Sequence, residues 1–493
     1  MSHSDPQPRE APAPADRRPV CVDLDGTLLA TDSLHELAIG LAWQRPLDLL
    51  RLPAWLAGGR AHLKARLAER IALDPARLPY RDDVLGALRA ARAQGRPCVL
   101  VTAADRRVAE AVADHLGLFS EVLASDGGAN LKGRRKAERL AERFGRGGFE
   151  YLGDAAADLP VWEAAGAASL VAPSEGLRRR VAARIPVERT LGARGGGGAR
   201  LRSWLRALRV HQWVKNLLVL LPLLASHRFD EPPLALLAAF AFAAFSLCSS
   251  AVYLWNDLAD LGADRAHPTK RLRPFASGEL PVAAGVLVAP LLLAAALGLA
   301  AATLPSRFAA ALGAYVLANF VYTFWLKRVA IADVVLLAAL YTLRVVAGGI
   351  AVSVVLSPWL LAFCLFFFLN LAFLKRYVDV RRIAEEGGGG RVPGRDYEAS
   401  DLTLLASMGL AAGYLAALIL ALYIQSENVA QLYRSPALLW LATPLAAYWV
   451  SRMWLLAHRG RMDDDPVAFA VRDPVTWAVG AAGALIAGLA SWA

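Results

Sequence analysis

The stretch that decides the fold runs from residue 232 to residue 278 and reads PPLALLAAFAFAAFSLCSSAVYLWNDLADLGADRAHPTKRLRPFASG. Residues 232–256 carry no charged side chain, which is long enough for an α-helix to span the hydrocarbon core of a bilayer. The rest holds three acids at helical spacing, Asp257, Asp260 and Asp264, and further on the bases Lys270, Arg271 and Arg273. A spanning helix that ends in such a cluster predicts a helical membrane domain with an ionic site at one membrane face.

The charge distribution extends this prediction to the whole C-terminal part. Only 42 of the 293 residues in 201–493 are charged, against 55 of the first 200. The apolar segments predict nine membrane spans, at about 213–227, 232–254, 282–303, 306–325, 330–352, 358–376, 402–424, 436–456 and 475–492. A single soluble domain is therefore excluded.

The basic residues between the spans predict an orientation. Fifteen Lys and Arg follow the even-numbered spans, whereas three lie in the opposite set of connections. Since basic loops stay inside, we expect a multi-pass protein of a bacterial plasma membrane with a cytoplasmic N-terminal domain and an external C-terminus. The net charge of +11 then comes from basic cytoplasmic loops that face anionic lipid headgroups. No nucleic-acid partner is expected. The sequence makes no prediction about the oligomeric state or the length of a lipid substrate.

The N-terminal part alternates between strand-like and helix-like patterns. We expect a disordered tail over residues 1–18 and a doubly wound α/β domain over 19–185, with a helical cap over about 32–96. The cap contains LLRLPAWLAGG, residues 49–59, which is also suited to a membrane surface. Residues 186–200 are Gly-rich and predict a linker, and 201–493 would form the membrane domain.

Polar residues follow the predicted strands in a pattern that indicates phosphate chemistry. Asp23 and Asp25 directly follow the first strand, where one carboxylate can attack phosphorus and the other can protonate the leaving oxygen. Thr102 ends the second strand, and Lys136 is placed to neutralise phosphate, with Lys132 as a less well-spaced alternative. Asp154 and Asp158 follow the third strand and are suited to Mg²⁺.

This set of motifs resembles the haloacid dehalogenase-like phosphohydrolases over about 165 residues. The resemblance implies that Asp23 becomes an aspartyl-phosphate, that Asp25 is the general acid and base, and that Thr102 and Lys136 bind phosphate. It also implies a Mg²⁺ site made by Asp23, Asp25, Asp154 and Asp158. The alternative is a degenerate domain kept as a scaffold, which the intact Asp23 and Asp25 disfavour.

The acidic end of the second span indicates binding of a diphosphate. Three acids crowded on one helix face repel one another unless divalent cations bridge them to an anion, so Asp257, Asp260 and Asp264 predict a second Mg²⁺ site. With Asn256 they resemble the motif of the UbiA-type prenyltransferase superfamily, which implies an all-helical nine-span fold around a cavity.

Four further segments resemble the decaprenyl-phosphate phosphoribosyltransferase branch of that superfamily: VHQWVKNLLVLLPL, DRAHPTKRLRP, ADVVLLAALYTLRVVAGG and LKRYVDVRR. Aromatic prenyltransferases of the superfamily carry a second cluster, typically DxxxD. Here Asp333 stands alone, because the residue four positions on is Leu337. This departure disfavours a prenyl diphosphate donor.

The resemblance implies transfer of 5-phosphoribose from phosphoribosyl diphosphate to a polyprenyl phosphate. Asp257 and Asp260 would be catalytic, and the expected substrate-binding residues are Asn256, Lys215, Lys270, Arg273, Asp333, Tyr341, Arg344, Lys375 and Arg376. Arg344 lies within a span, where we expect it to line a pocket and pair with an acid or a phosphate. A buried structural ion pair is the alternative.

The two halves suggest a coupled reaction, because the lipid product would still carry the 5-phosphate that a phosphatase removes. A tether would raise the local concentration of that second active site. Three alternatives stay open: an aromatic prenyltransferase beside an unrelated phosphatase, a lipid-phosphate carrier or scaffold, and a regulatory phosphatase domain that senses the donor. The acidic loop with Asp465 and Asp473 is expected to be solvated, or else to gate the cavity.

Overall fold

The computed structural model describes residues 17–126, 130–192, 196–385, 392, 395–426, 429, 432–462 and 465–492. The chain divides into two compact units. The first unit comprises the residues up to Leu208 together with Leu254–Val288, and the second comprises Arg209–Tyr253 and the residues from Ala289. Most of the predicted tail (1–16) and part of the predicted linker (193–195) lie outside the described residues.

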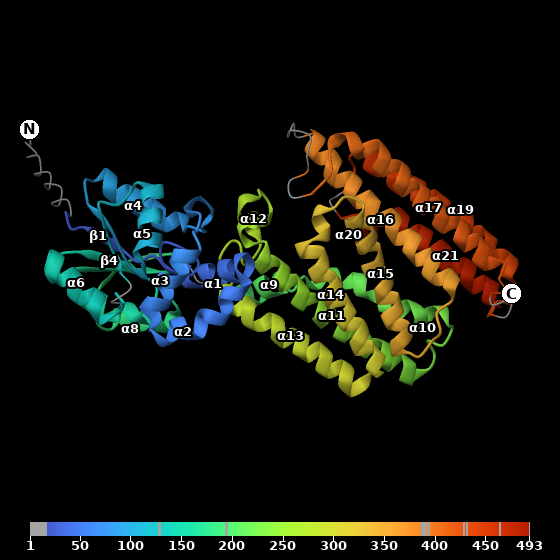
Figure 1. Cartoon of the computed structure of the whole chain (residues 1–493), viewed down its shortest axis with the longest axis horizontal. Helices are drawn as coiled ribbons and strands as arrows, with labels where there is room; N and C mark the ends of the chain where they lie inside the picture. Colours follow the sequence, from blue (N-terminus) through green and yellow to red (C-terminus); the bar gives the residue numbers. More distant parts are fainter. Residues whose placement is uncertain are drawn as a thin grey trace, which may run out of the picture. The chain divides into compact units, whose positions relative to one another are not determined.

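The first unit is built on a six-stranded parallel sheet with the order β3-β2-β1-β4-β5-β6. Figure 1 labels β1 and β4 of this sheet among the helices of the first unit. Its strands are β1 (Val20–Val22), β2 (Cys98–Asp105), β3 (Glu121–Ser125), β4 (Glu150–Gly153), β5 (Ala167–Val171) and β6 (Val187–Leu191). The order reverses at β1, which has β2 on one side and β4 on the other. In such sheets ligands bind beyond the carboxyl ends of the strands at this switch point.

Side chains along each strand alternate between two apolar cores, one on each face of the sheet. Val20 and Val22 join one core, whereas Cys21 between them joins the other. Helices α4 (Asp82–Ala93) and α5 (Arg106–Leu116) cover the first face. The opposite face is covered by α6 (Arg134–Phe144), α7 (Leu159–Ala164) and α8 (Glu175–Ala182). The predicted α/β domain with a parallel sheet is therefore confirmed.

The structure adds two strands that the sequence analysis missed. The sequence indicates four strands through the apolar runs VCVDL, PCVLVTA, FEYLGD and ASLVAP, and β3 and β6 are not among them. The assignment of 186–200 to a linker was wrong in part, because Val187–Leu191 pair with β5 and Gly197–Ala207 form helix α9. Strand β6 alternates between half-buried and exposed residues, as an edge strand does, so it lacks the apolar run that identified the central strands.

The predicted cap region lies between β1 and β2. It contains α1 (Ser33–Gln44), a 3₁₀ segment η1 (Pro46–Arg51), α2 (Leu52–Ala57) and α3 (Arg60–Arg70), followed by η2 (Pro75–Arg77). The last part of the predicted cap, up to residue 96, is instead mostly α4, which covers the sheet. Leu47 and Leu50 are each 81% exposed and Leu56 is 54% exposed. The region therefore presents leucine side chains at its surface. The first unit also includes the short helix α12 (Leu261–Ala266) and the 3₁₀ segments η3 (Ala156–Asp158) and η5 (Lys270–Leu272).

The second unit is helical. Seven helices in the described part of the chain are long and apolar enough to cross a membrane: α11 (Pro232–Ala259), α13 (Val282–Thr303), α14 (Ser306–Phe324), α15 (Ala332–Ala351), α16 (Pro358–Glu385), α17 (Leu402–Ile424) and α21 (Pro474–Trp492). Helices α11 and α13 extend into the first unit at one end. Helix α16 packs against α15 and α17, and α17 packs against α19 (Ala442–His458).

The prediction of nine spans is not confirmed. The first expected span is a 3₁₀ segment η4 (Val210–Leu220) followed by the five-residue helix α10 (Leu221–Ala225), which has Pro222 in its first turn. The eighth divides into η8 (Pro436–Leu441) and α19, which has only 17 residues. The remaining elements are η6 (Leu326–Arg328), η7 (Ala399–Asp401) and α20 (Pro466–Arg472).

Candidate active sites

The residues after β1 and β4 form the centre of the first site. Asp23 follows β1 directly, and its carboxylate Oδ1 lies 2.9 Å from the Lys136 ammonium and 2.8 Å from the Leu24 backbone N–H that donates to it. Lys136 is only 2% exposed and also donates to the Tyr151 hydroxyl at 3.0 Å. The structure thus brings together the predicted nucleophile and the predicted lysine, and Lys136 rather than Lys132 makes this contact.

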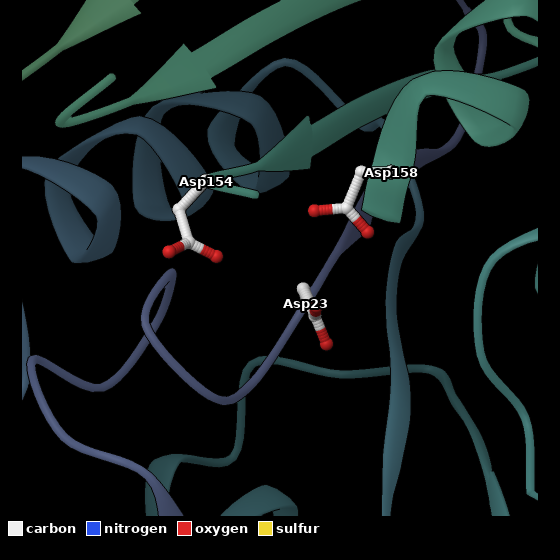
Figure 2. A group of neighbouring side chains, drawn as sticks. All are labelled: Asp23, Asp154 and Asp158. Carbon is white, nitrogen blue, oxygen red and sulfur yellow. The ribbon is translucent and has the colours of Figure 1, made fainter. Parts of the chain in front are cut away.

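Two further carboxylates lie next to Asp23 (Figure 2). Ligand oxygens of Asp23, Asp154 and Asp158 all lie within 4.8 Å of one another. Burial and the negative charge of Asp23 raise the pKa of Asp158 to about 6, although Lys136 opposes the shift. Three carboxylates against one lysine leave excess negative charge, and hard oxygen ligands suit Mg²⁺. These residues therefore fit the predicted metal ion.

The local backbone makes this close approach possible. Gly26 has a φ of +79°, and a Cβ atom built on it would lie 2.5 Å from Asp154 Oδ2, so a larger residue would displace that carboxylate. Thr27 is fully buried and its hydroxyl donates to Asp154 Oδ1 at 3.2 Å. The turn after β1 thereby positions an acid that follows β4, 127 residues further along the chain.

Asp25 lies in a different environment from the three clustered carboxylates of Asp23, Asp154 and Asp158. Its carboxylate accepts hydrogen bonds from the Ser33 backbone N–H at 2.8 Å and from the Ser33 hydroxyl at 3.2 Å. Burial, followed by the negative charge of Asp32, raises the pKa of Asp25 to about 7. Such a group holds a proton near neutral pH, as a general acid must. Its carboxylate lies outside the cluster formed by Asp23, Asp154 and Asp158, and a metal-binding role for Asp25 stays a prediction.

A cavity of about 880 Å³ opens at these residues. Asp23, Asp25, Asp154, Asp158 and Lys136 all line it. Thr102 does not, because its side chain is fully buried and its hydroxyl oxygen accepts a hydrogen bond from the Ala104 N–H at 2.9 Å. The neighbouring Ala103 lines the cavity, and phosphate binding by Thr102 stays a prediction.

The acidic motif at the end of α11 forms a second group. The three acids do not share one continuous helix, because α11 ends at Ala259 and α12 begins at Leu261, with Asp260 between them. Arg273 nevertheless contacts two of the acids, at 3.2 Å from Asp257 and 2.7 Å from Asp264. Asp257 and Asp264 are each 3% exposed, and burial raises the pKa of Asp264 although Arg273 opposes the shift.

Arg273 was predicted as a substrate-binding residue, and here it bridges the acids. In the described part of the chain, Asp257, Asp260 and Asp264 do not form a close carboxylate group like the one at Asp23. Asn256 and Lys270 belong to the same segment and make interactions of their own. The sequence-predicted acids and the arginine are thus brought together, with the guanidinium at 31% exposure lying against two of the carboxylates.

The second unit holds a pair of opposite charges that was only partly expected. The Lys215 ammonium donates to Asp465 Oδ2 at 2.5 Å, and the Asp465 carboxylate also accepts from the Val467 and Ala468 N–H groups at the start of α20. Burial opposes ionisation of Asp465, but the charges of Lys215 and of the predicted ligand Lys375 lower its pKa overall. Expecting Asp465 to be a solvated loop residue was wrong.

Arg344 lies on α15 and is 4% exposed. It donates to Asn216 Oδ1 at 3.0 Å, to the Leu340 carbonyl at 2.7 Å and to the Tyr315 hydroxyl at 3.1 Å. Its guanidinium also lies 5.1 Å from the centre of the Tyr341 ring. The expected acid partner is absent among the described residues, so neutral oxygens and aromatic rings surround this buried cation.

Asp333 and Arg376 form a buried ion pair. Both side chains are fully buried, and Asp333 Oδ2 lies 2.6 Å from Arg376 and 3.2 Å from Arg395, while Asp333 Oδ1 accepts from the Tyr397 hydroxyl at 2.6 Å. Both residues were predicted to bind substrate. The structure places both in a buried ion pair, and their contact with substrate stays a prediction.

Several contact residues carry no signal that sequence reasoning can use. Tyr151 lies in a buried strand and its hydroxyl donates to Asp158 Oδ1 at 3.1 Å. Asn216 and Tyr315 meet Arg344 from positions 128 and 29 residues away. Asp473, expected to be solvated or gating, instead accepts two hydrogen bonds from Arg452. Only the three-dimensional structure pairs these residues.

The fold and the two sites define a class: a multi-pass membrane protein that carries an α/β phosphohydrolase-like domain at its N-terminus. The UbiA prenyltransferase family model matches residues 217–479, and the model of haloacid dehalogenase-like hydrolases matches residues 20–163. The chain belongs to the UbiA prenyltransferase family. It therefore combines an enzyme domain of that family with a hydrolase-like domain, and both resemblances inferred from the motifs are confirmed.

Named relatives cover different parts of the chain. An uncharacterized protein, y4nM, of Sinorhizobium fredii is 41% identical over 94% of this chain and 89% of its own length. The nodulation protein NoeC of Azorhizobium caulinodans is 35% identical over 55% of this chain and 87% of its own length. A decaprenyl-phosphate phosphoribosyltransferase of Mycolicibacterium smegmatis is 36% identical over 40% of this chain and 63% of its own length.

Proposed function

We propose that the membrane domain transfers 5-phosphoribose from phosphoribosyl diphosphate to a polyprenyl phosphate, such as decaprenyl phosphate, and releases diphosphate. The haloacid dehalogenase-like domain then removes the 5-phosphate from the lipid product. In the transfer, a phosphate oxygen of the lipid forms a bond to ribose C1 as the bond from C1 to the diphosphate breaks. The attacking phosphate is already anionic, so the protein needs to supply positioning and charge neutralisation rather than a strong base.

The observation that carries the transfer half is the environment of Asp333. Arg376, Arg395 and Tyr397 engage both of its carboxylate oxygens, so Asp333 does not offer the second metal-binding cluster that a prenyl diphosphate donor would use. Arg344 has no carboxylate partner in the described part of the chain, so no acid there neutralises its positive charge. The relative from Mycolicibacterium smegmatis supports the same choice of donor.

The phosphatase half is supported by the geometry around Asp23. Asp23 would attack phosphorus to form an aspartyl-phosphate, with Lys136 neutralising charge at 2.9 Å. Asp25, protonated near neutral pH, would donate its proton to the leaving sugar oxygen and later accept one from the water that hydrolyses the intermediate. Bound Mg²⁺ would compensate the negative charge shared by the carboxylates and the phosphate. We place this domain on the cytoplasmic side of a bacterial plasma membrane, as the basic loops predict.

The transfer reaction is tested with detergent-purified protein, labelled phosphoribosyl diphosphate and polyprenyl phosphate. We expect a labelled lipid in the wild-type protein and a large loss in Asp257→Asn. A labelled lipid formed only from a prenyl diphosphate and an aromatic acceptor would overturn the proposal and favour aromatic prenylation. Full transfer activity in Asp257→Asn would instead point to a carrier or scaffold role.

The coupled step is tested with Asp23→Asn in the same assay. We expect the 5-phosphorylated lipid to accumulate, because transfer continues while dephosphorylation stops. Asp25→Asn should reduce phosphate release about 10²- to 10⁴-fold, as loss of a general acid does. An unchanged ratio of phosphorylated to dephosphorylated lipid in Asp23→Asn would refute the coupling and leave the transfer half standing.

A further inference from the structure

One wall of the phosphatase cavity comes from residues outside the α/β sheet. Helix α9 contributes Ala199, Arg200 and Ser203, and the segment after the acidic motif contributes Ser277, Gly278, Glu279, Pro281 and Val282. All of these residues belong to the first unit. The cavity is therefore larger than the crevice at the strand ends alone.

The two parts of this wall are joined to each other. The Glu279 carboxylate accepts hydrogen bonds from the Ser203 hydroxyl at 2.6 Å and from Arg206 of α9. Gly278 has a φ of +78°, and a Cβ atom built on it would lie 2.6 Å from the Ala30 carbonyl oxygen in the turn after β1. The wall thus stands directly beside the loop that carries Asp25.

The size of the cavity exceeds what a phosphate group requires. Cavities of about 300–1,000 Å³ hold ligands of drug size, and this one measures about 880 Å³. The phosphate that reacts at Asp23 would fill only a small part of it. The remaining volume is large enough for the group to which that phosphate is attached.

The cations that line the cavity differ in their existing contacts. Lys136 pairs with Asp23, Lys64 donates to the Ala103 carbonyl at 2.7 Å, and Arg81 donates to the Gly26 carbonyl at 3.1 Å. Lys132 and Arg200 also line the cavity and are exposed, and among the described residues neither side chain has an ion-pair or hydrogen-bond partner. Two cations thus stay available after the catalytic charges are matched.

We propose that Lys132 and Arg200 form a second anion-binding subsite of the phosphatase, which selects sugar phosphate monoesters that carry a second phosphate group. This inference rests on the phosphatase half of the proposed function and deepens it. One phosphate reacts at Asp23, and the second binds the two free cations. Two kinds of ligand carry such a second phosphate group. One is a sugar joined to a lipid by a phosphodiester, and the other is a soluble sugar with two phosphate groups.

The test compares two inhibitors that differ by one phosphate. Ribose 5-phosphate and ribose 1,5-bisphosphate compete with p-nitrophenyl phosphate in the full-length, detergent-purified protein. We expect an inhibition constant at least ten-fold lower for the bisphosphate in the wild-type protein, and a difference below two-fold in Lys132→Ala/Arg200→Ala. Arg202→Ala is the matched control, because Arg202 is an exposed arginine of the same helix that does not line the cavity.

The following outcomes would contradict the proposal that Lys132 and Arg200 bind a second phosphate group. Equal inhibition by the two sugars in the wild-type protein, or a preference that survives in the double variant, would show that Lys132 and Arg200 bind no second phosphate. An equal loss in Arg202→Ala would show general electrostatic attraction. Absence of p-nitrophenyl phosphate hydrolysis would instead count against the phosphatase, and calorimetry of both sugars with Asp23→Asn would still measure the preference.

A final comparison separates lipid-linked from soluble ligands. Vesicles of phosphatidylcholine with phosphatidylinositol 4-phosphate present a phosphomonoester and a phosphodiester at a membrane, whereas glycerophosphoinositol 4-phosphate presents both in solution. The exposed leucines of the cap region, Leu47, Leu50 and Leu56, suit contact with a bilayer, so we expect stronger inhibition by the vesicles. If the vesicles, counted per accessible headgroup, inhibit no more strongly than glycerophosphoinositol 4-phosphate, the subsite is assigned to soluble sugars.

Discussion

The ion pair between Glu36 and Arg265 offers a quantitative test of the first unit. Arg265 of α12 donates to both carboxylate oxygens of Glu36 on α1, at 3.0 Å and 2.7 Å, and the side chains are only 7% and 5% exposed. Glu36 also accepts from the Thr31 hydroxyl at 2.6 Å, and Arg265 donates to the Ala276 carbonyl at 3.1 Å. This pair joins the α/β domain to the acidic motif.

The expected effect depends on whether one or both charges are removed. Removing one partner of a buried pair leaves an uncompensated charge and costs about 3–5 kcal/mol, whereas replacing both partners by apolar side chains of similar size is often neutral. We expect Arg265→Met to lose about 3 kcal/mol, at the lower end because Thr31 still donates to Glu36. The double variant Glu36→Leu/Arg265→Met should lose much less than the sum of its single variants.

Pulse proteolysis over a urea series measures these free energies in detergent-purified protein, since a brief protease pulse cleaves only unfolded chains. Because about 1.4 kcal/mol is ten-fold in an equilibrium constant, the loss of about 3 kcal/mol in Arg265→Met raises the unfolded fraction about 100-fold. Single variants within 0.5 kcal/mol of the wild type, or strictly additive losses in the double variant, would refute the reasoning that this pair is buried and mutually compensating.

Three further predictions follow from particular contacts. Gly278→Val should destabilise the first unit by about 1–3 kcal/mol because of its positive φ and its contact with Ala30, whereas Gly262→Ala, with open space around it, should be neutral or stabilising; equal thermal shifts would contradict this. A hydrogen bond from Arg452 lowers the pKa of Asp473, so its carboxylate stabilises the fold at neutral pH and that contribution disappears as pH falls through the lowered pKa. The difference in melting temperature between wild type and Asp473→Asn should therefore shrink from pH 7 to pH 3. Chelation by EDTA should abolish p-nitrophenyl phosphate hydrolysis, and added Mg²⁺ should restore it; hydrolysis that persists in EDTA would exclude a required divalent ion.

Much of the first site was predictable from sequence because parallel strands present their carboxyl ends at one edge. Asp23 and Asp154 each follow a short buried strand, and β1 and β4 are neighbours in the sheet. Lys136 was chosen over Lys132 from its spacing, and the structure places its ammonium at Asp23. Local order along the chain was sufficient here, since adjacent strands convert sequence positions into spatial proximity.

The sequence by itself determined the two-part organisation, the phosphatase centre and most of the apolar spans, because hydrophobic runs and strand-end motifs are local properties. Tertiary structure alone decided how the remaining charges are compensated. Asp333 and Arg376 were predicted as substrate ligands, and the structure places them in a fully buried ion pair. Arg344 looked like half of an ion pair, yet neutral oxygens and aromatic rings hold it. A buried charge must find a partner, and which partner it finds depends on helix packing that brings together residues far apart in the chain.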